Sequence, residues 1–263
     1  EEKMLQYRPA DFYEKNGVTT LLGRKAVKID AAAKTVVLED GASVPYDKLC
    51  ICTGSRPFVP PMAGLDTVEN KTSFMTLDDA KHLDAMLGSE NDKRVLIIGA
   101  GLIGLKCAEG IYQRVKELTV IDLAPRILPN VLTEVPASII QRHIESKGVK
   151  FLLEDSVEQF EPHTAHLKSG KTIDFDVLVV AVGVRPNTEL AAEAGCEVNR
   201  GILTDACSAT TVPDIYAAGD CAVSHDIAAD TDRILAILPN AYMQGETAGR
   251  NRADSRNLPR RSR

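Results

Sequence analysis

The chain has 263 residues, of which 44% are hydrophobic, so it can bury the core of one large or two ordinary domains. Its formal charge of −6 argues against nucleic acid or an anionic membrane as a partner. The longest apolar runs, residues 95–105 and 177–184, are too short to span a bilayer, and the charged first residues do not resemble a signal peptide. We therefore expect a cytoplasmic protein with no membrane or nucleic-acid partner.

The chemistry-bearing side chains outside the glycine motifs give weak signals. No cluster of cysteine, histidine and carboxylate residues has metal-ligand spacing, so we expect no metal site. None of the six cysteines belongs to a C-x-x-C pair, and we expect all six to be reduced and buried. We place Cys50 and Cys52 on opposite faces of one strand and expect no disulfide between them.

The first half of the chain predicts a series of strands and helices. A D-G turn precedes an apolar strand that ends at Gly54, and a proline-rich segment, 57–65, follows. A helix begins after Thr76, with Asp79 completing a capping box, and stops at Gly88. A strand, a glycine-rich turn and a helix then span residues 95–115, and residues 118–122 form the next strand.

The second half continues the alternation. We expect a helix over 134–147, capped by Thr133, and an antiparallel meander over 151–172. An apolar strand ends at Gly183, another lies within 214–221, and a closing helix spans 239–251. Alternating strands and helices predict a parallel, doubly wound sheet.

Two segments, 38–57 and 167–186, match each other at a constant offset of 129 positions. Each predicts a hairpin turn followed by an apolar strand that ends at glycine. The register has no gap, which indicates two copies of one nucleotide-binding architecture. The identical pairs are Leu38/Leu167, Gly41/Gly170, Asp47/Asp176, Leu49/Leu178, Gly54/Gly183, Arg56/Arg185 and Pro57/Pro186.

The repeat predicts an α/β fold with two Rossmann-like nucleotide-binding domains, the second inserted into the first. At the same offset, the glycine turn of the first copy would precede residue 1, so we expect the first domain to be N-terminally truncated. The expected parts are 1–75 and 198–252 for the first domain, 76–197 for the inserted domain, and a disordered basic tail, 253–263.

The sequence G-A-G-L-I-G, residues Gly99, Ala100, Gly101, Leu102, Ile103 and Gly104, follows a strand and opens a helix. In such a motif the first glycine allows a tight turn, the second lets a pyrophosphate approach the backbone, and the third lets helix and strand pack closely. Asp122, at the end of the next strand, is placed to accept hydrogen bonds from the ribose 2′-hydroxyl and to repel a 2′-phosphate. The motif therefore predicts a dinucleotide site that prefers NADH, and Arg126 lies near enough to soften that preference.

Several motifs together resemble the FAD-dependent pyridine nucleotide-disulfide oxidoreductases. They are T-G-S-R-P at 53–57, G-A-G-L-I-G at 99–104, V-G-V-R-P at 182–186 and Y-A-A-G-D at 216–220. The branch with NADH:rubredoxin reductases, NADH oxidases and nitrite reductase large subunits is most similar, and residues 238–249 resemble its closing flavin-domain helix.

The resemblance implies FAD and NADH as cofactors and assigns residues to them. Asp220 would bind the FAD ribitol, and Gly219 would allow close approach of the cofactor. The resemblance also implies that Thr53, Gly54 and Arg56 contact the flavin. The backbone of Val27 would contact the adenine, and Gly183 would contact the nicotinamide nucleotide.

The chain departs from the family's pattern at both ends and at one helical position. The FAD glycine motif and the C-terminal interface domain, through which relatives form homodimers, are absent from the sequence. Lys106 stands where many relatives carry a glutamate near the nicotinamide. Two interpretations of Lys106 remain: a catalytic residue that orients the nicotinamide, or a helix-surface partner of Glu109.

The resemblance implies an oxidoreductase that passes hydride from NADH to FAD and electrons on to an unidentified acceptor. That acceptor is a rubredoxin-like protein, oxygen or a small molecule. Two alternatives remain open: a truncated, non-catalytic NADH-binding fragment, and a dehydrogenase with one Rossmann domain and no flavin. The 129-residue repeat and the Y-A-A-G-D segment count against the last of these.

Overall fold

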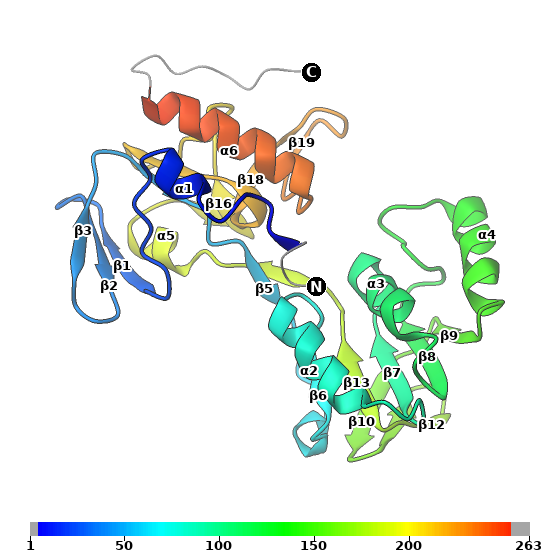
Figure 1. Ribbon diagram of the computed structural model, residues 1–263. Helices are drawn as coiled ribbons and strands as arrows, with labels where there is room; N and C mark the ends of the chain where they lie inside the picture. Colours follow the sequence, from blue (N-terminus) through cyan, green and yellow to red (C-terminus); the bar gives the residue numbers. More distant parts are fainter. Residues whose placement is uncertain (1–4, 254–263) are drawn as a thin grey trace. The chain divides into compact units, whose positions relative to one another are not determined.

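The computed structural model describes residues 5–253 and divides the chain into two compact units. Unit 2 is continuous and spans residues 55–185 (Figure 1). Unit 1 is formed by the described residues on both sides of it, 5–54 and 186–253. The predicted mixed α/β architecture, with one unit inserted into the other, is confirmed.

Unit 2 contains a five-stranded parallel sheet. Its apolar strands are buried on both faces, as expected for a parallel sheet. In sheet order, its strands are β6 (Lys71–Thr72), β13 (Val177–Val180), β7 (Arg94–Ile98), β8 (Glu117–Asp122) and β9 (Val149–Leu153).

Side chains alternate between the two faces of this sheet. Val95 and Ile97 face the helices α2 (Leu77–Leu87), α3 (Leu102–Ile111) and α4 (Glu134–Glu145). Leu96 and Ile98 face a core that includes the three-stranded antiparallel meander β10 (Val157–Glu161), β11 (Thr164–Leu167) and β12 (Thr172–Asp174).

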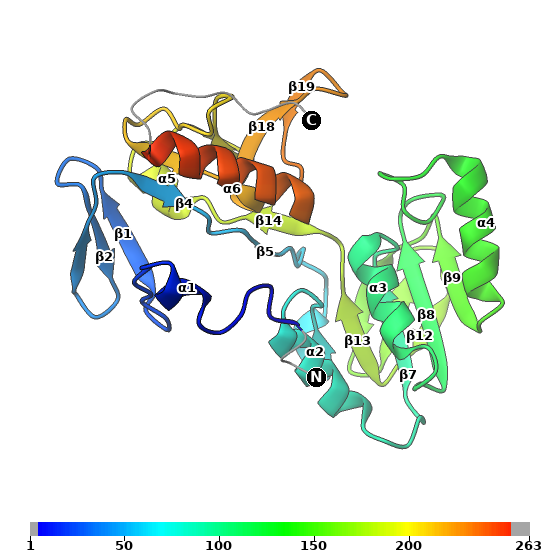
Figure 2. The same ribbon diagram turned by 45° about the horizontal axis from the view of Figure 1, so that its top comes forward.

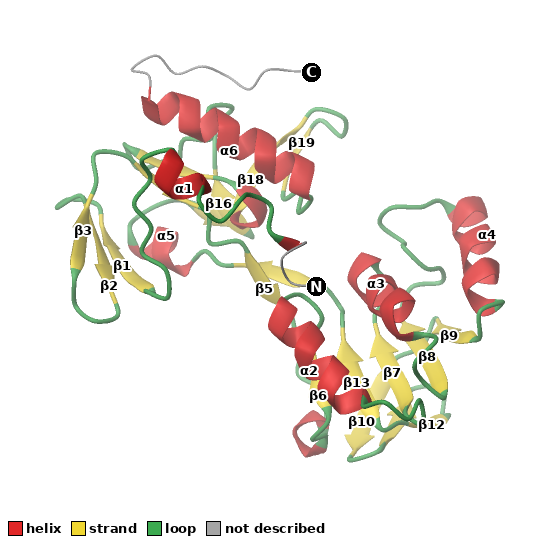
Figure 3. Ribbon diagram, in the orientation of Figure 1, coloured by secondary structure: helices red, strands yellow, loops and turns green. Residues whose placement is uncertain are grey.

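The expectation of a doubly wound sheet is therefore wrong for unit 2, where helices cover one face and the meander covers the other (Figure 3). Two aromatic residues of this second layer, Phe160 and Phe175, are fully buried and pack edge to face, with their ring centroids 6.1 Å apart. Residues 151–153, which begin the segment expected to form the meander, instead belong to the outer parallel strand β9.

The helix boundaries follow the local signals closely. Thr76 Oγ1 accepts the Asp79 N–H and the Asp79 carboxylate accepts the Thr76 N–H, so the predicted capping box is confirmed, and Gly88 ends α2. Thr133 occupies the N-cap of α4 without a side-chain cap hydrogen bond. The helices α3 and α4 end at Ile111 and Glu145, a few residues before the expected ends.

Unit 1 is built from shorter strands. Its last helix is α6 (Leu238–Ala253), drawn in orange-red in Figure 2. This helix packs against β17 (Ile215–Ala217) and the 3-10 turn at Gly219–Cys221. The strands of unit 1 form an antiparallel meander of β1 (Ala26–Asp30), β2 (Thr35–Leu38) and β3 (Ser43–Pro45), and a parallel pair of β4 (Leu49–Ile51) and β17. The remaining elements are the sheet of β15 (Val198–Asn199), β16 (Gly201–Leu203), β18 (Ala222–Asp226) and β19 (Thr231–Arg233), and the helices α1 (Phe12–Lys15) and α5 (Glu189–Glu193).

The sequence repeat is also a repeat of structure. β2, β3 and β5 (Ser55–Pro57) recur 129 residues later, with the same bounds, as β11, β12 and β14 (Val184–Pro186). In each copy a three-stranded meander leads into a parallel strand, β4 or β13. Among the described residues β4 pairs with one neighbour, β17, whereas β13 lies between β6 and β7.

The unit boundaries differ from the expected ones, 75/76 and 197/198. They lie at 54/55 and 185/186, because each flanking segment packs into a particular core. Val68, which is 1% exposed, packs with the meander core of unit 2. Ala191 and Cys196 pack with Ile51 in unit 1. The expected tail, 253–263, lies outside the described residues apart from Ala253 at the end of α6.

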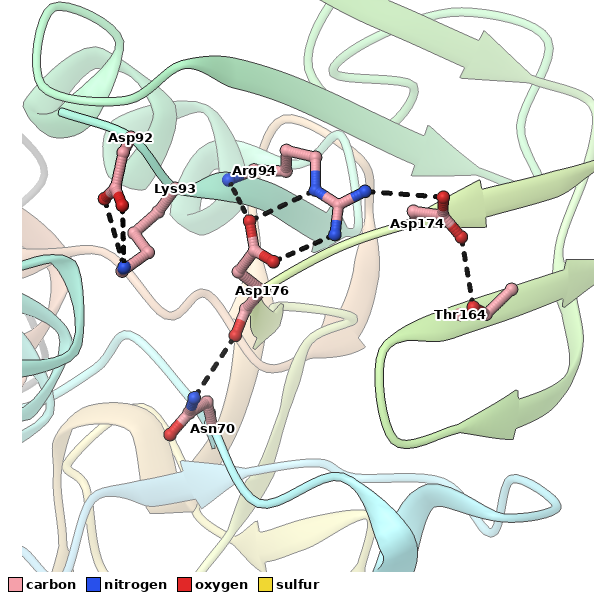
Figure 4. Close-up of polar contacts among 7 residues, drawn as sticks. All are labelled: Asn70, Asp92, Lys93, Arg94, Thr164, Asp174 and Asp176. Atoms are coloured by element: carbon pink, nitrogen blue, oxygen red, sulfur yellow. Dashed lines mark hydrogen bonds and ion pairs between the residues drawn. The ribbon is translucent and has the colours of Figure 1, made fainter.

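A polar cluster ties the start of β7 to the hairpin before β13 (Figure 4). Asp176 Oδ2 accepts hydrogen bonds from the backbone N–H (2.8 Å) and Nε (3.1 Å) of Arg94, and Oδ1 accepts one from Nη2 (2.9 Å). Arg94 Nη1 also lies 3.3 Å from Asp174 Oδ2, and Asp174 Oδ1 accepts the Thr164 hydroxyl. The hydrogen bonds from Arg94 lower the pKa of Asp176 to about 2.

Candidate functional site

Three parallel strands of unit 2 end at one edge of the sheet. Ile98 at the end of β7 lies opposite Ile121 of β8 and opposite Val180 of β13. The residues that follow these positions, Gly99, Asp122 and the segment up to Gly183, therefore lie along the same edge. In open α/β sheets this carboxyl edge is where nucleotides bind.

The glycine turn after β7 combines close packing with open space. Gly99 has φ 111°, and a Cβ there would lie 2.3 Å from the Ala181 carbonyl oxygen, while a Cβ at Gly104 would lie 1.9 Å from the Gly99 carbonyl oxygen. At Gly101, the N-cap of α3, an added Cβ would meet nothing within 4 Å. The turn thus leaves the N-terminus of α3 open to an anionic group.

The two residues between the second and third glycines differ in exposure. Leu102 is 54% exposed at the first position of α3, whereas Ile103 packs against the helix-side core. These positions leave Leu102 accessible beside the open end of the helix.

Asp122 binds the glycine turn directly. Its Oδ2 accepts the Ala100 N–H at 2.7 Å, and its Oδ1 accepts the Ala124 N–H at 2.7 Å. This second task is not visible in the sequence, because the contact joins residues 22 positions apart. The carboxylate of Asp122 is therefore held in one orientation at the sheet edge.

The guanidinium of Arg126 is engaged by its own loop. Nε donates to the Leu132 carbonyl oxygen at 3.1 Å, and Nη2 donates to that of Pro129 at 3.2 Å. Arg126 thus stabilises the connection between β8 and α4, which is a different role from the softening of nucleotide preference expected of it.

Lys106 lies on the exposed surface of α3. Its Nζ is 2.7 Å from Glu109 Oε2, and the two side chains are 71% and 65% exposed. The helix-surface ion pair is therefore formed, and ion pairs this exposed contribute little to stability. The catalytic role of Lys106 stays a prediction.

Unit 1 has a second edge of the same kind, formed by the parallel strands β4 and β17. Ala217 lies opposite Ile51, and the Ala218 N–H donates to the Ile51 carbonyl oxygen at 3.1 Å. Both strands end here, so Thr53 and Gly54 follow one strand and Gly219 and Asp220 follow the other. The structure thus brings together these four residues of the predicted flavin site.

Thr53 is fixed by an exchange of hydrogen bonds with Asn187. The Thr53 hydroxyl donates to the Asn187 carbonyl oxygen at 2.6 Å, and Asn187 Nδ2 donates to the Thr53 carbonyl oxygen at 2.9 Å. The Asn187 N–H also donates to the carbonyl oxygen of Gly54. Asn187 therefore holds the loop after β4, a role that sequence reasoning missed.

Gln244 plays the matching role at the other strand of this edge. Its side chain is fully buried, its Oε1 accepts the Gly219 N–H at 2.6 Å, and its Nε2 donates to Ser224 Oγ at 3.0 Å. Gly219 is held there with φ 81°. The contact joins residues 25 positions apart, so no local signal in the sequence marked it.

Two further predicted residues lie away from these edges. Val27 is an exposed residue of β1, where the ladder with β2 shifts register between Ala26 and Lys28. Arg56 lies on β5, which belongs to unit 2 and pairs with β14. Their predicted cofactor contacts stay predictions.

The cysteines differ from expectation in burial and in orientation. None of the six forms a disulfide, but Cys52 is exposed and Cys50 and Cys207 are only partly buried. The Sγ atoms of Cys50 and Cys52 lie 3.6 Å apart. The expected opposite orientation is wrong, because residues two apart in a strand point to the same face. Over residues 5–253 the structure has no group of three or more side chains suited to a metal ion, and no helix there is long and apolar enough to cross a membrane.

Two carboxyl edges of parallel strands, each followed by a glycine-containing turn and an acidic side chain, define a protein with two nucleotide-binding units. Residues 4–245 match the family described as pyridine nucleotide-disulphide oxidoreductase. The chain belongs to this family, as its motifs indicated.

Curated relatives share about a third of its residues. It is 37% identical over 223 residues to nitrite reductase [NAD(P)H] of Bacillus subtilis (strain 168), a match that covers 83% of this chain and 27% of that protein. It is 31% identical to the NADH oxidase of Methanocaldococcus jannaschii (95% and 57% covered). It is 30% identical to the rubredoxin-NAD(+) reductase of Pseudomonas putida (93% and 64%). The chain thus spans between about a quarter and two thirds of the length of these relatives.

Solved structures share the fold. The covalent putidaredoxin reductase–putidaredoxin complex matches with a TM-score of 0.90 and 28% identity, over 100% of this chain and 64% of that chain. The water-forming NADH oxidase from Lactobacillus brevis, bound to NADH, matches with a TM-score of 0.89 and 27% identity, over 99% of this chain and 59% of that chain. An engineered NADPH oxidase made from that enzyme, bound to NADPH, matches with a TM-score of 0.86 and 27% identity, over 96% of this chain and 57% of that chain.

Proposed function

We propose that the chain is the nucleotide-binding part of an FAD-dependent NAD(P)H oxidoreductase in which hydride passes from NADH to FAD and electrons continue to an acceptor. The observation that carries this proposal is the pair of carboxyl edges, one in each unit, within a chain that matches the family over residues 4–245. A dehydrogenase with a single nucleotide domain does not account for the second edge.

NADH is the proposed donor at the edge of unit 2. The open N-terminus of α3 at Gly101 would receive the pyrophosphate, and the oriented carboxylate of Asp122 would accept the ribose hydroxyls. The engineered NADPH oxidase supports this assignment. In that enzyme the replaced residues include a glycine, an aspartate eighteen residues later and a proline seven residues beyond that. This chain has Gly104, Asp122 and Pro129 at the same spacing.

FAD is proposed at the edge of unit 1. Asp220 would bind the ribitol, and Gly219, whose N–H is held by Gln244, would let the cofactor approach the backbone. Thr53 and Gly54, anchored by Asn187, would line the flavin from the neighbouring strand. When bound, FAD accepts hydride and releases electrons, so the protein supplies binding and orientation.

The names of the relatives support a small redox protein as the acceptor. One relative is a rubredoxin-NAD(+) reductase, and one matched structure is a reductase covalently joined to putidaredoxin. We infer an electron-carrier protein of this kind, with homodimer formation as a further prediction.

The first test is the visible spectrum of the purified chain with added FAD, before and after NADH is added without oxygen. A flavin band that bleaches supports the proposal. A bound flavin that NADH leaves oxidised contradicts it. A colourless protein that still binds NADH supports the alternative described next.

The alternative is an NADH-binding protein that does not retain flavin by itself. It is favoured by one observation: the single Gly-x-Gly-x-x-Gly motif of the sequence lies in unit 2, and unit 1 has no such turn among its described residues. Equilibrium dialysis with FAD and NADH separately distinguishes the two functions.

A further inference from the structure

A pair of thiols lies at the end of β4, outside the residues assigned above. Cys50 and Cys52 project from the same face of this strand, and their Sγ atoms are 3.6 Å apart. Ile51 between them points to the opposite face and is buried in the unit 1 core. Cys52 follows the last residue of β4.

These two cysteines differ in accessibility from the three buried cysteines, and Cys207 is partly exposed like Cys50. Cys52 is exposed and Cys50 is partly exposed, whereas Cys107, Cys196 and Cys221 are buried. Burial raises the pKa of the Cys107 thiol to about 12 and also raises the pKa values of Cys196 and Cys221, so these thiols are poor nucleophiles.

A positive charge lies on the same side of the strand pair. Tyr216 of β17 is paired with Cys50 across the two strands, and the Lys48 ammonium is 6.0 Å from the centroid of the Tyr216 ring. Attack on a disulfide requires the thiolate form of a cysteine.

We propose that Cys50 and Cys52 form a dithiol site that undergoes exchange with low-molecular-weight disulfides, closing an intramolecular disulfide. The Cys52 thiolate attacks one sulfur of R–S–S–R, forms a mixed disulfide and releases the first R–SH after protonation. The Cys50 thiolate then attacks Cys52 Sγ and releases the second R–SH. The two protein thiols lose two electrons and two protons, and R–S–S–R gains them. The site does not depend on the function proposed above.

The test uses the full, folded chain incubated with oxidised glutathione, quenched with acid, and treated with N-ethylmaleimide under denaturing conditions. We expect two of the six cysteines to resist alkylation, with no glutathione retained. Trypsin releases both residues in one peptide, 49–71, which contains no other cysteine. That peptide is expected to be lighter than the reduced peptide by the mass of two hydrogen atoms.

Three variants distinguish the thiol that attacks the small disulfide from the thiol that closes the intramolecular disulfide. Cys50→Ser is expected to stop at the mixed disulfide, with one glutathione on Cys52, and Cys52→Ser is expected to lose most of the reaction. Cys207→Ser, at a partly exposed cysteine elsewhere in unit 1, is the matched control and is expected to behave as the parent chain. Accumulation of the mixed disulfide in the parent chain, or a Cys52–Cys221 bond, would overturn the proposal. So would a peptide 49–71 that stays fully reduced.

Discussion

Asp122 holds the glycine turn with the same carboxylate that we propose for the ribose. Each oxygen accepts one backbone N–H, from Ala100 or Ala124, and a carboxylate has further lone pairs for the hydroxyls of a ribose. The side chain that would select the nucleotide therefore also holds the turn that would receive the pyrophosphate. Replacing it is expected to affect both.

Asp122→Ala should weaken NADH binding by roughly tenfold or more, because it removes hydrogen bonds worth about 1–3 kcal/mol. NADPH should lose less, since the repulsion of its 2′-phosphate disappears as well. Fluorescence titration with both nucleotides measures the change. Asp92→Ala, at an exposed carboxylate before β7, is the control. If the parent chain and Asp122→Ala bind NADH with the same affinity, and also bind NADPH with the same affinity, the ribose assignment is excluded.

Tyr46 shows the opposite situation, a polar group without a partner. Its buried hydroxyl finds no hydrogen-bond partner among the described residues, and its counterpart in the second copy, Phe175, is fully buried and apolar. An unsatisfied buried hydroxyl costs stability. Tyr46 is therefore a weak point of the unit 1 core.

Tyr46→Phe should leave the free energy of unfolding unchanged or raise it by up to about 1 kcal/mol. The reciprocal change, Phe175→Tyr, should lower it by about 1–3 kcal/mol, because it introduces a hydroxyl into an apolar core. Denaturant unfolding measures both. A clear loss of stability in Tyr46→Phe would show that the hydroxyl has a partner in solution.

The strands of unit 2 depend on the link between Arg94 and Asp176. Asp176 accepts both the backbone N–H and the guanidinium of Arg94, so one side chain sets where β7 begins relative to β13. The repeat places Asp47 at the equivalent position before β4. The same residue type therefore precedes the parallel strand in both copies.

Asp176→Asn should lower the free energy of unfolding by about 1–2 kcal/mol at pH 7, a range that allows for solvent screening of a side chain about one third exposed. The hydrogen bonds from Arg94 hold the folded-state pKa of Asp176 at about 2, below the unfolded value of about 3.9. The contribution of Asp176 is thus present above about pH 4 and is lost as the pH falls through about 2.

Urea unfolding of the parent chain and of Asp176→Asn at a series of pH values measures this difference. The gap should shrink as the pH falls from 4 towards 2. Asp174→Asn, at the more exposed of the two carboxylates, should cost less than about 1 kcal/mol. A gap that does not change with pH would contradict the role assigned to the ionised carboxylate.

The two units have separate cores, so ligand effects should be local. NADH at one hundred times its dissociation constant should stabilise unit 2 by about 2.7 kcal/mol. Hydrogen exchange should slow in residues 95–124, around the glycine turn and Asp122, and should not change in the β1–β3 meander of unit 1. Slowing confined to residues 215–226 would place NADH in the wrong unit.

Local signals predicted much of this architecture. The glycine turn and the capping box at Thr76 are found where their residues indicated, whereas β4 and β13 end three residues before Gly54 and Gly183. Such signals act within a few residues, because turns and caps depend on backbone conformation and on neighbours three or four positions away. The unit boundaries were displaced because Val68 and Ala191 join cores built from distant segments.

The amino-acid sequence by itself determined that the chain holds two copies of one nucleotide-binding plan and where the dinucleotide motif lies. It did so because the repeat and the glycine pattern are properties of residue order. Only the tertiary structure decided that Gln244 holds Gly219, that Arg94 meets Asp176, and that the second face of the unit 2 sheet is covered by a meander. These contacts join residues between 25 and 82 positions apart or depend on which surfaces pack together. No local pattern encodes them, because their free energy exists only once the whole chain has folded.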